Sequence, residues 1–308
     1  MKCQKIIIDT DPGIDDAMAI FFAGLSDKLD LVAMTSVFGN VTLDIATRNA
    51  MVLAEILKQK IPVSRGFSKP LVQIPNPVSD YVHGEEGFGD IPARKPKSKE
   101  LSLPAHEYIC DLINANVGEI ILCPVGPLTN IAMALRHDPT IAAKVKSIVI
   151  MGGGVFSGGN VTEYAEANIW NDPHAADEVF AADWEVTVIG LDVTQKVVCA
   201  HSEFSELARK APIIGGFLEQ ATDFYIKFYK EAAGIDGCQM HDPITVVAKL
   251  YPDLFKYEYH PIEVCLELPR IGETIICKDK KRRLAKIAVD VDIDAVKKIF
   301  FDTIETGF

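Results

Sequence analysis

Four carboxylates lie within eight residues near the start of the chain, in the segment DTDPGIDD at residues 9–16. Asp9 and Asp11 are two residues apart at the end of an expected strand, where alternate side chains point to the same side. Asp15 and Asp16 open the helix that should follow. Anions crowded together in this way repel one another unless a cation neutralises them. Because every donor is an oxygen atom, the segment predicts a site for Ca²⁺ or Mg²⁺ rather than for zinc.

Two other interpretations of this segment remain open. Asp15 and Asp16 could serve only as helix caps that interact favourably with the helix dipole, which leaves Asp9 and Asp11 unexplained. The Asp9-x-Asp11 spacing also resembles the nucleophile loop of haloacid-dehalogenase-type phosphatases. The Asp15–Asp16 pair has no counterpart in that loop, and basic residues are lacking near the segment.

Polar residues that could bind a small molecule recur further along the chain. Three glycines at 152–154 follow an expected strand without completing a dinucleotide or P-loop spacing, so they favour a tight backbone path beside a ligand. Asn160, Glu166 and Asn168 lie in a polar stretch that could equally be a surface loop. His241 and Asp242 precede an apolar helix, which Asp242 could simply cap.

The elements that must position these residues alternate along the first 190 residues. Buried strands are expected at 5–9, 29–37, 61–63, 119–123, 146–151 and 185–191, and helices at 15–25, 43–58, 106–114, 128–136 and 173–182. Strands that alternate with helices pair in parallel through right-handed crossovers. Their continuously apolar sequences indicate a sheet buried on both faces. Such sheets bind ligands at the carboxyl ends of their strands, where the acidic segment lies.

The pattern changes in two places. The proline- and glycine-rich segment 64–100 is expected to be one long loop, and its YVHGEEGFG stretch at 81–89 favours a functional lid. After residue 200, helices are expected at about 202–208, 213–233, 243–250 and 292–304, with a β-rich stretch at about 262–290. Residues 1–308 are therefore expected to form a single α/β domain. Its open, mostly parallel, Rossmann-like central sheet is flanked by helices and followed by a C-terminal helical and β extension.

Composition narrows the class of partner. Of the 308 residues 48% are hydrophobic and 24% charged, and the formal net charge is −12. This acidic balance disfavours nucleic acid, whose phosphates need cationic contacts. No apolar run approaches the roughly 20 residues that span a bilayer, and the first residues lack the pattern of an export signal, so we expect a cytoplasmic protein without membrane contact. Seven cysteines without a C-x-x-C pair are expected to be reduced.

Seven motifs carry a family resemblance. They are DTDPGIDDA at 9–17, VFGN at 37–40, HGExG at 83–87, GxLTN at 126–130, MGGG at 151–154, ExN at 166–168 and HDP at 241–243. With these motifs the chain resembles nucleoside hydrolases of the inosine–uridine-preferring type over nearly its whole length. The resemblance implies Ca²⁺-dependent hydrolysis of the N-glycosidic bond of purine or pyrimidine ribonucleosides, within nucleoside salvage. It also implies a homodimer or homotetramer.

The resemblance further implies a role for each site residue. The carboxylates of Asp11, Asp16 and Asp242 and the main-chain carbonyl of Val125 would bind Ca²⁺, with Asp11 as general base for the attacking water and His241 as acid or orienter for the leaving base. The ribose would be bound by Asp15, Asn40, Asn160, Glu166, Asn168 and the Met151 carbonyl. His83 would close over the base together with Tyr225 and Tyr229, two tyrosines one helical turn apart that could instead pack in the core. A histidine at 241 points away from the purine-specific branch and leaves inosine, uridine and cytidine open. A non-catalytic nucleoside or ribose sensor with the same pocket remains the alternative.

Overall fold

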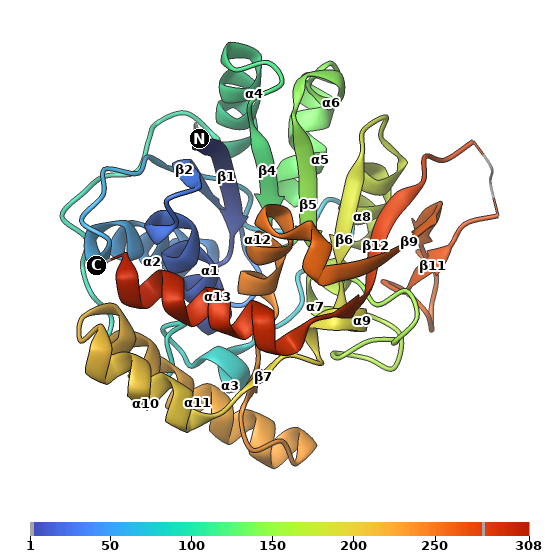
Figure 1. The fold of residues 1–308 in the computed structure, drawn as a ribbon. Helices are drawn as coiled ribbons and strands as arrows, with labels where there is room; N and C mark the ends of the chain where they lie inside the picture. Colours follow the sequence, from blue (N-terminus) through green and yellow to red (C-terminus); the bar gives the residue numbers. More distant parts are fainter. Residues whose placement is uncertain (1–2, 279–280, 308) are drawn as a thin grey trace.

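A computed structural model describes residues 3–278 and 281–307, so Met1 and Lys2 of the expected N-terminus lie outside the described residues. Its central sheet consists of β1 (Gln4–Thr10), β2 (Leu29–Ser36), β3 (Val63–Arg65), β4 (Ile121–Pro124), β5 (Ser147–Met151), β6 (Val186–Ile189), β9 (Phe255–His260) and β12 (Ala285–Val291). These strands lie in the order β3-β2-β1-β4-β5-β6-β12-β9 (Figure 1). Every neighbouring pair is parallel except β12 and β9, which are antiparallel.

Helices cover both faces of this sheet. They are α1 (Ile14–Leu25), α2 (Leu43–Ile56), α3 (Asp80–His83), α4 (Ala105–Ala115), α5 (Thr129–His137), α6 (Ile141–Lys144), α7 (Ala167–Asn171), α8 (Pro173–Ala181), α9 (Leu191–Thr194), α10 (His201–Lys210), α11 (Ile214–Ala233), α12 (Asp242–Leu250) and α13 (Ile293–Thr306), with the 3-10 helix η1 (Pro252–Leu254). Two short ribbons pair β7 (Val198–Cys199) with β8 (Cys238–Gln239) and β10 (Ile262–Val264) with β11 (Thr274–Ile276).

Alternation along β1 divides the core into two layers. Ile6 and Ile8 pack in a cluster with α1, α2, α11, α12 and α13, whereas Ile7 packs with α4, α5 and α8 on the other face. Successive side chains of a strand point to opposite faces, so a strand buried on both must be apolar throughout. In Figure 1, α12 and α13 lie in front of the sheet. Among the described residues, no helix is long and apolar enough to cross a membrane.

The predicted α/β class is confirmed, and the C-terminal region differs from the expectation in one respect. Only part of it is an extension, because β12 pairs with β6 and β9 pairs with β12, and both strands thereby complete the central sheet. The segment 64–100 is largely irregular but contains the end of β3 and the short helix α3. It is fastened to the end of α7, since the Gln73 side chain donates to the Trp170 carbonyl at 2.9 Å and the Leu71 amide to Asp172 at 2.9 Å.

Candidate active site

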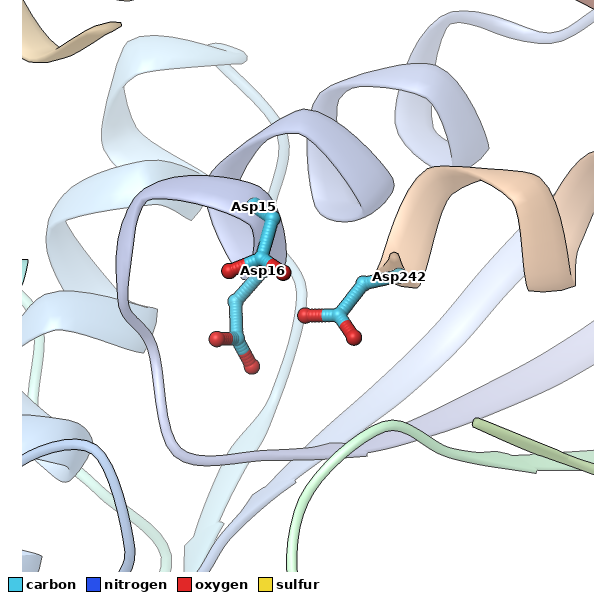
Figure 2. A group of neighbouring side chains, drawn as sticks. All are labelled: Asp15, Asp16 and Asp242. Atoms are coloured by element: carbon cyan, nitrogen blue, oxygen red, sulfur yellow. The ribbon is translucent and has the colours of Figure 1, made fainter. Parts of the chain in front are cut away.

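The acidic segment forms the turn between β1 and α1, at the carboxyl end of the sheet. Asp15 and Asp16 lie in the first turn of α1, and Asp242 is the first residue of α12 and points toward them (Figure 2). One carboxylate oxygen from each of the three lies within 4.8 Å of the others. All three are buried at helix N-termini, where the positive ends of two helix dipoles partly offset the negative charge.

Asp16 is held by four donors. Its carboxylate accepts hydrogen bonds from the Thr10 hydroxyl, from the Gly13 amide at 2.9 Å, from the Asp11 amide at 3.2 Å and from the Asn40 side chain at 3.1 Å. The turn at residues 10–13 therefore folds back on the helix that it starts. This network fixes Asp16 in one orientation.

Asp11 lies beside this group, outside the three carboxylates within 4.8 Å of one another. Its Oδ2 accepts from the Asn40 amide at 2.6 Å, and its Oδ1 has no hydrogen-bond partner among the described residues. Two glycines permit this position, because a Cβ at Gly39 would lie 2.0 Å from Oδ2 and a Cβ at Gly126 would lie 2.5 Å from Oδ1. The DTDPG, VFGN and GxLTN motifs thus meet around one carboxylate.

Asp9 is held apart from the others by different partners. Its Oδ1 accepts from the Thr35 hydroxyl at 2.5 Å and from the Asn130 side chain at 2.7 Å, while its Oδ2 has no partner among the described residues. The Asn130 bond gives the GxLTN motif a second function, which is to connect α5 to the end of β1.

Burial dominates the electrostatics of these carboxylates. It raises the pKa of Asp9 from its ordinary value of 3.8 to about 7 and, together with the charge of Asp16, the pKa of Asp15 to about 8. Burial followed by the neighbouring charges also raises the pKa of Asp11 and of Asp242. Buried carboxylate oxygens of Asp9, Asp11 and Asp15 lack partners among the described residues. Oxygen donors that are buried, crowded and unpaired fit a hard divalent cation.

A cavity of about 450 Å³ opens above the carboxylates and is large enough for a small organic ligand. Every residue that we expected at the site lines this cavity except Asp11 and Asp16. The lining members of the expected set are Asp15, Asn40, His83, Val125, Met151, Asn160, Glu166, Asn168, Tyr225, Tyr229, His241 and Asp242. Among the described residues, no lysine or arginine lines the cavity.

One wall is built by the start of α7. Glu166 caps this helix, and its carboxylate accepts from the amides of Asn168 at 3.0 Å and Gly153 at 2.9 Å. The Asn168 side chain then donates to the main-chain carbonyls of Val125 at 2.8 Å and Met151 at 3.3 Å. The polar stretch at 160–168 is therefore part of the cavity rather than a surface loop alone.

Another part of the cavity lining carries two imidazoles and two phenols. His83, at the end of α3, accepts from the Ile14 amide at 3.2 Å, and its ring centroid lies 5.4 Å from that of Tyr225. Tyr225 and Tyr229 are buried, as core packing would predict, but their hydroxyls point to polar partners in the cavity: Asp15 at 3.4 Å and His241 at 2.8 Å. Burial lowers the pKa of His83 to about 3 and the pKa of His241 to about 4, so both rings are neutral near pH 7.

Residues 6–298 match the family model described as inosine-uridine preferring nucleoside hydrolase. The chain belongs to the nucleoside hydrolase family. It is 39% identical over 282 residues to uridine nucleosidase 1 of Arabidopsis thaliana, a match that covers 91% of this chain and 84% of that protein. It is 36% identical over 309 residues to the inosine-uridine preferring nucleoside hydrolase of Leishmania major, which covers 98% of both. The solved structure of a plant nucleoside hydrolase superposes with a TM-score of 0.95 at 37% identity and covers 98% of this chain and 99% of that one.

This nucleoside hydrolase is an enzyme of the class that acts on N-glycosyl bonds of ribonucleosides. The family is metal-dependent, and the group of Asp15, Asp16 and Asp242 is an acidic cluster suited to a metal. The resemblance stated from the sequence is confirmed, and neither the sensor nor the phosphatase interpretation is favoured. Thr194, Gln195 and Gln239 also lie in or beside the cavity wall and were not predicted. No local motif marks them, since they lie at the ends of the short elements α9 and β8, which reach the cavity through tertiary packing.

Proposed function

We propose that this nucleoside hydrolase releases ribose and free base from both purine and pyrimidine ribonucleosides, with Ca²⁺ as its metal. The observation that carries the proposal is the position of buried, partly unpaired carboxylates on the floor of a cavity whose wall presents His241. Relatives with related substrates support its breadth, since one is named for uridine and another for inosine and uridine.

The carboxylates of Asp11, Asp16 and Asp242 and the carbonyl of Val125 are the proposed ligands of the cation. Their donors are all oxygen atoms, which Ca²⁺ prefers. Asp15 belongs to the same group of acidic side chains, so its negative charge adds to the attraction. When bound, the cation would supply positive charge that lowers the pKa of a water molecule and attracts hydroxyl oxygens of the sugar.

Asp11 is the proposed general base. Its Oδ2 is fixed by the Asn40 amide, whereas its buried Oδ1 has no partner among the described residues and is available for a proton. Asp11 takes a proton from water as the water oxygen bonds to C1′ and the bond from C1′ to the base nitrogen breaks, leaving its electrons on the base. The transition state resembles an oxocarbenium ion, as in glycosidases.

Polar groups of the acidic floor and of the α7 wall are proposed to bind the ribose. They are Asp15, Asn40, Asn160, Glu166, Asn168 and the Met151 carbonyl. Most of these groups are buried, so a sugar that lacks a hydroxyl would leave them unpaired. We therefore expect ribonucleosides to be strongly preferred to 2′-deoxyribonucleosides.

The part of the lining that carries the two imidazoles and two phenols is proposed to act on the base. His241 donates from a ring N–H to the departing nitrogen and assists its protonation, while His83, Tyr225 and Tyr229 close around the base. We further propose that the enzyme acts in nucleoside salvage in the cytoplasm as a homodimer or homotetramer. Its net charge of −12 and the absence of lysine and arginine from the described cavity lining favour an uncharged nucleoside over nucleic acid.

A ribose-release assay tests the proposal. Purified protein is incubated with inosine, uridine, cytidine and 2′-deoxyuridine in Ca²⁺, in EGTA, and in EGTA followed by excess Ca²⁺. We expect release of ribose from the three ribonucleosides, its loss in EGTA and its recovery with Ca²⁺. Nucleoside binding without any release would replace the proposal with the sensor, and Mg²⁺-dependent cleavage of p-nitrophenyl phosphate instead would replace it with the phosphatase.

A further inference from the structure

The imidazole of His241 lies between two hydroxyl groups. Its Nδ1 is 2.8 Å from Oγ1 of Thr194, and its Nε2 is 2.8 Å from the hydroxyl of Tyr229. Thr194 is the last residue of the short helix α9, which follows β6, and it is fully buried. A neutral imidazole has one N–H donor and one bare acceptor nitrogen, so the directions of these two hydrogen bonds decide which nitrogen carries the proton.

The direction of the Tyr229 bond follows from the chain of hydroxyls beyond it. When Asp15 is ionised, Tyr225 donates its proton to Oδ2 of Asp15 at 3.4 Å, so the Tyr225 oxygen accepts from the Tyr229 hydroxyl at 3.3 Å. Because each phenol has one proton, the Tyr229 oxygen must then accept from His241. The proton of the imidazole therefore resides on Nε2.

The direction of the Thr194 bond follows from burial. Among the described residues, His241 Nδ1 is the one hydrogen-bond partner of the Thr194 hydroxyl. If Nδ1 carried the proton, the buried hydroxyl hydrogen would have no acceptor, which costs more than an ordinary hydrogen bond gains. Thr194 therefore donates to a bare Nδ1. The hydrogen bonds on the two sides of the imidazole therefore specify the same tautomer.

We propose that Thr194 is a positioning residue for hydrolysis: it holds neutral His241 as the Nε2–H tautomer, with Nδ1 accepting from Thr194 and Nε2–H at the Tyr229 hydroxyl on the cavity wall. This inference rests on the proposed function, in which Nε2–H leaves the Tyr229 oxygen to donate to the nitrogen of the departing base. Without the Thr194 hydroxyl, Nδ1 can carry the proton and Nε2 becomes an acceptor. Substrate binding would change little, whereas the step in which the base departs would slow.

The experiment combines kinetics with ¹⁵N NMR of histidine-labelled protein, and the His241 signals are assigned by their loss in His241→Ala. In the wild type we expect a protonated Nε2 and a bare Nδ1. Thr194→Val, which keeps the shape of the side chain, should mix the tautomers and lower kcat by roughly 10-fold with KM nearly unchanged. Thr194→Ser should restore both readouts. Thr245→Val is the matched control, because it removes a buried hydroxyl from α12 that has no partner among the described residues.

Several results would overturn the proposal. A proton on Nδ1 in the wild type would do so without any variant. So would an unchanged kcat in folded Thr194→Val, an equal loss in Thr245→Val, or a further loss when Thr194→Val is added to His241→Ala. An inactive wild-type protein would instead reject the proposed function, because the tautomer is read without turnover.

Discussion

Stabilisation by Ca²⁺ should increase with pH. Metal-free carboxyls buried at the site hold protons, and a cation must displace those protons in order to bind. The folded-state pKa of Asp15, about 8, lies above the unfolded value of 3.8. Such a group stabilises the fold at low pH, and its contribution is lost as pH rises from the unfolded pKa through the folded pKa. His83 and His241 have lowered pKa values, of about 3 and about 4, and so stay neutral in the folded state above pH 7.

This value sets the size of the effect. Between about pH 7 and about pH 8.5 the metal-free folded state loses about 1 kcal/mol relative to the unfolded state, because Asp15 keeps a proton that the unfolded chain has released. For a chain of this length roughly 2 °C of Tm corresponds to 1 kcal/mol, so the increase in Tm on adding Ca²⁺ should be about 2 °C larger at the higher pH. Thermal unfolding followed by circular dichroism in EGTA and in saturating Ca²⁺ at the two pH values measures this difference. Exposed groups that titrate between the two pH values change Tm equally in EGTA and in Ca²⁺, so their effect cancels in the difference.

Two variants test whether the effect belongs to the site. Asp242→Asn removes a proposed ligand and should abolish most of the Ca²⁺ gain at both pH values. Asp236→Asn removes a carboxylate whose side chain is 85% exposed and should leave the gain intact. A Ca²⁺ gain that stays constant or shrinks with rising pH in the wild type would refute the assignment of buried Asp15 to the cation site.

Three further predictions concern single residues. Asp11→Asn should lower kcat far more than it raises KM in the ribose-release assay, and retained turnover would exclude Asp11 as the base. His241→Ala should lose inosine hydrolysis but keep most activity toward p-nitrophenyl riboside, whose leaving group needs no protonation; equal losses on both substrates would contradict its role at the base. Phe300→Ala should lower stability by about 3–5 kcal/mol, measured by urea unfolding, because its fully buried ring stacks on Phe22 at a centroid distance of 6.1 Å; KM should not change.

Much of the fold could be predicted from local sequence. The strands β1 to β6 lie within a few residues of their expected positions, since a buried parallel strand is a short apolar run that needs no partner to be recognised. The edge of the sheet could not be predicted in the same way. In β9 the burial of side chains is irregular, and its place beside β12 depends on a pairing between segments about 30 residues apart. A local pattern does not specify such a partner.

The site shows the same division between local and long-range information. The acidic segment could be predicted as a metal site because its carboxylates are neighbours in sequence. The role of Thr194 could not be predicted, because α9 is four residues long and lacks helical periodicity. Its importance depends on the approach of a histidine 47 residues away. Tyr225 and Tyr229 are intermediate, since helical spacing placed them on one face of α11 but only packing showed that their hydroxyls reach the cavity.

The raised pKa of Asp11 affects how this buried side chain can act as the general base. Burial raises the pKa of Asp11, which favours its protonated form in the metal-free protein and so makes it a weaker acceptor of a proton from water. A nearby cation reverses this preference by favouring the ionised form. Loss of activity in EGTA would then have two causes, namely the loss of a ligand for water and sugar and the protonation of the base itself. These causes can be separated: if protonation contributes, residual activity in EGTA should rise with pH, whereas loss of the ligand alone predicts a residual activity independent of pH.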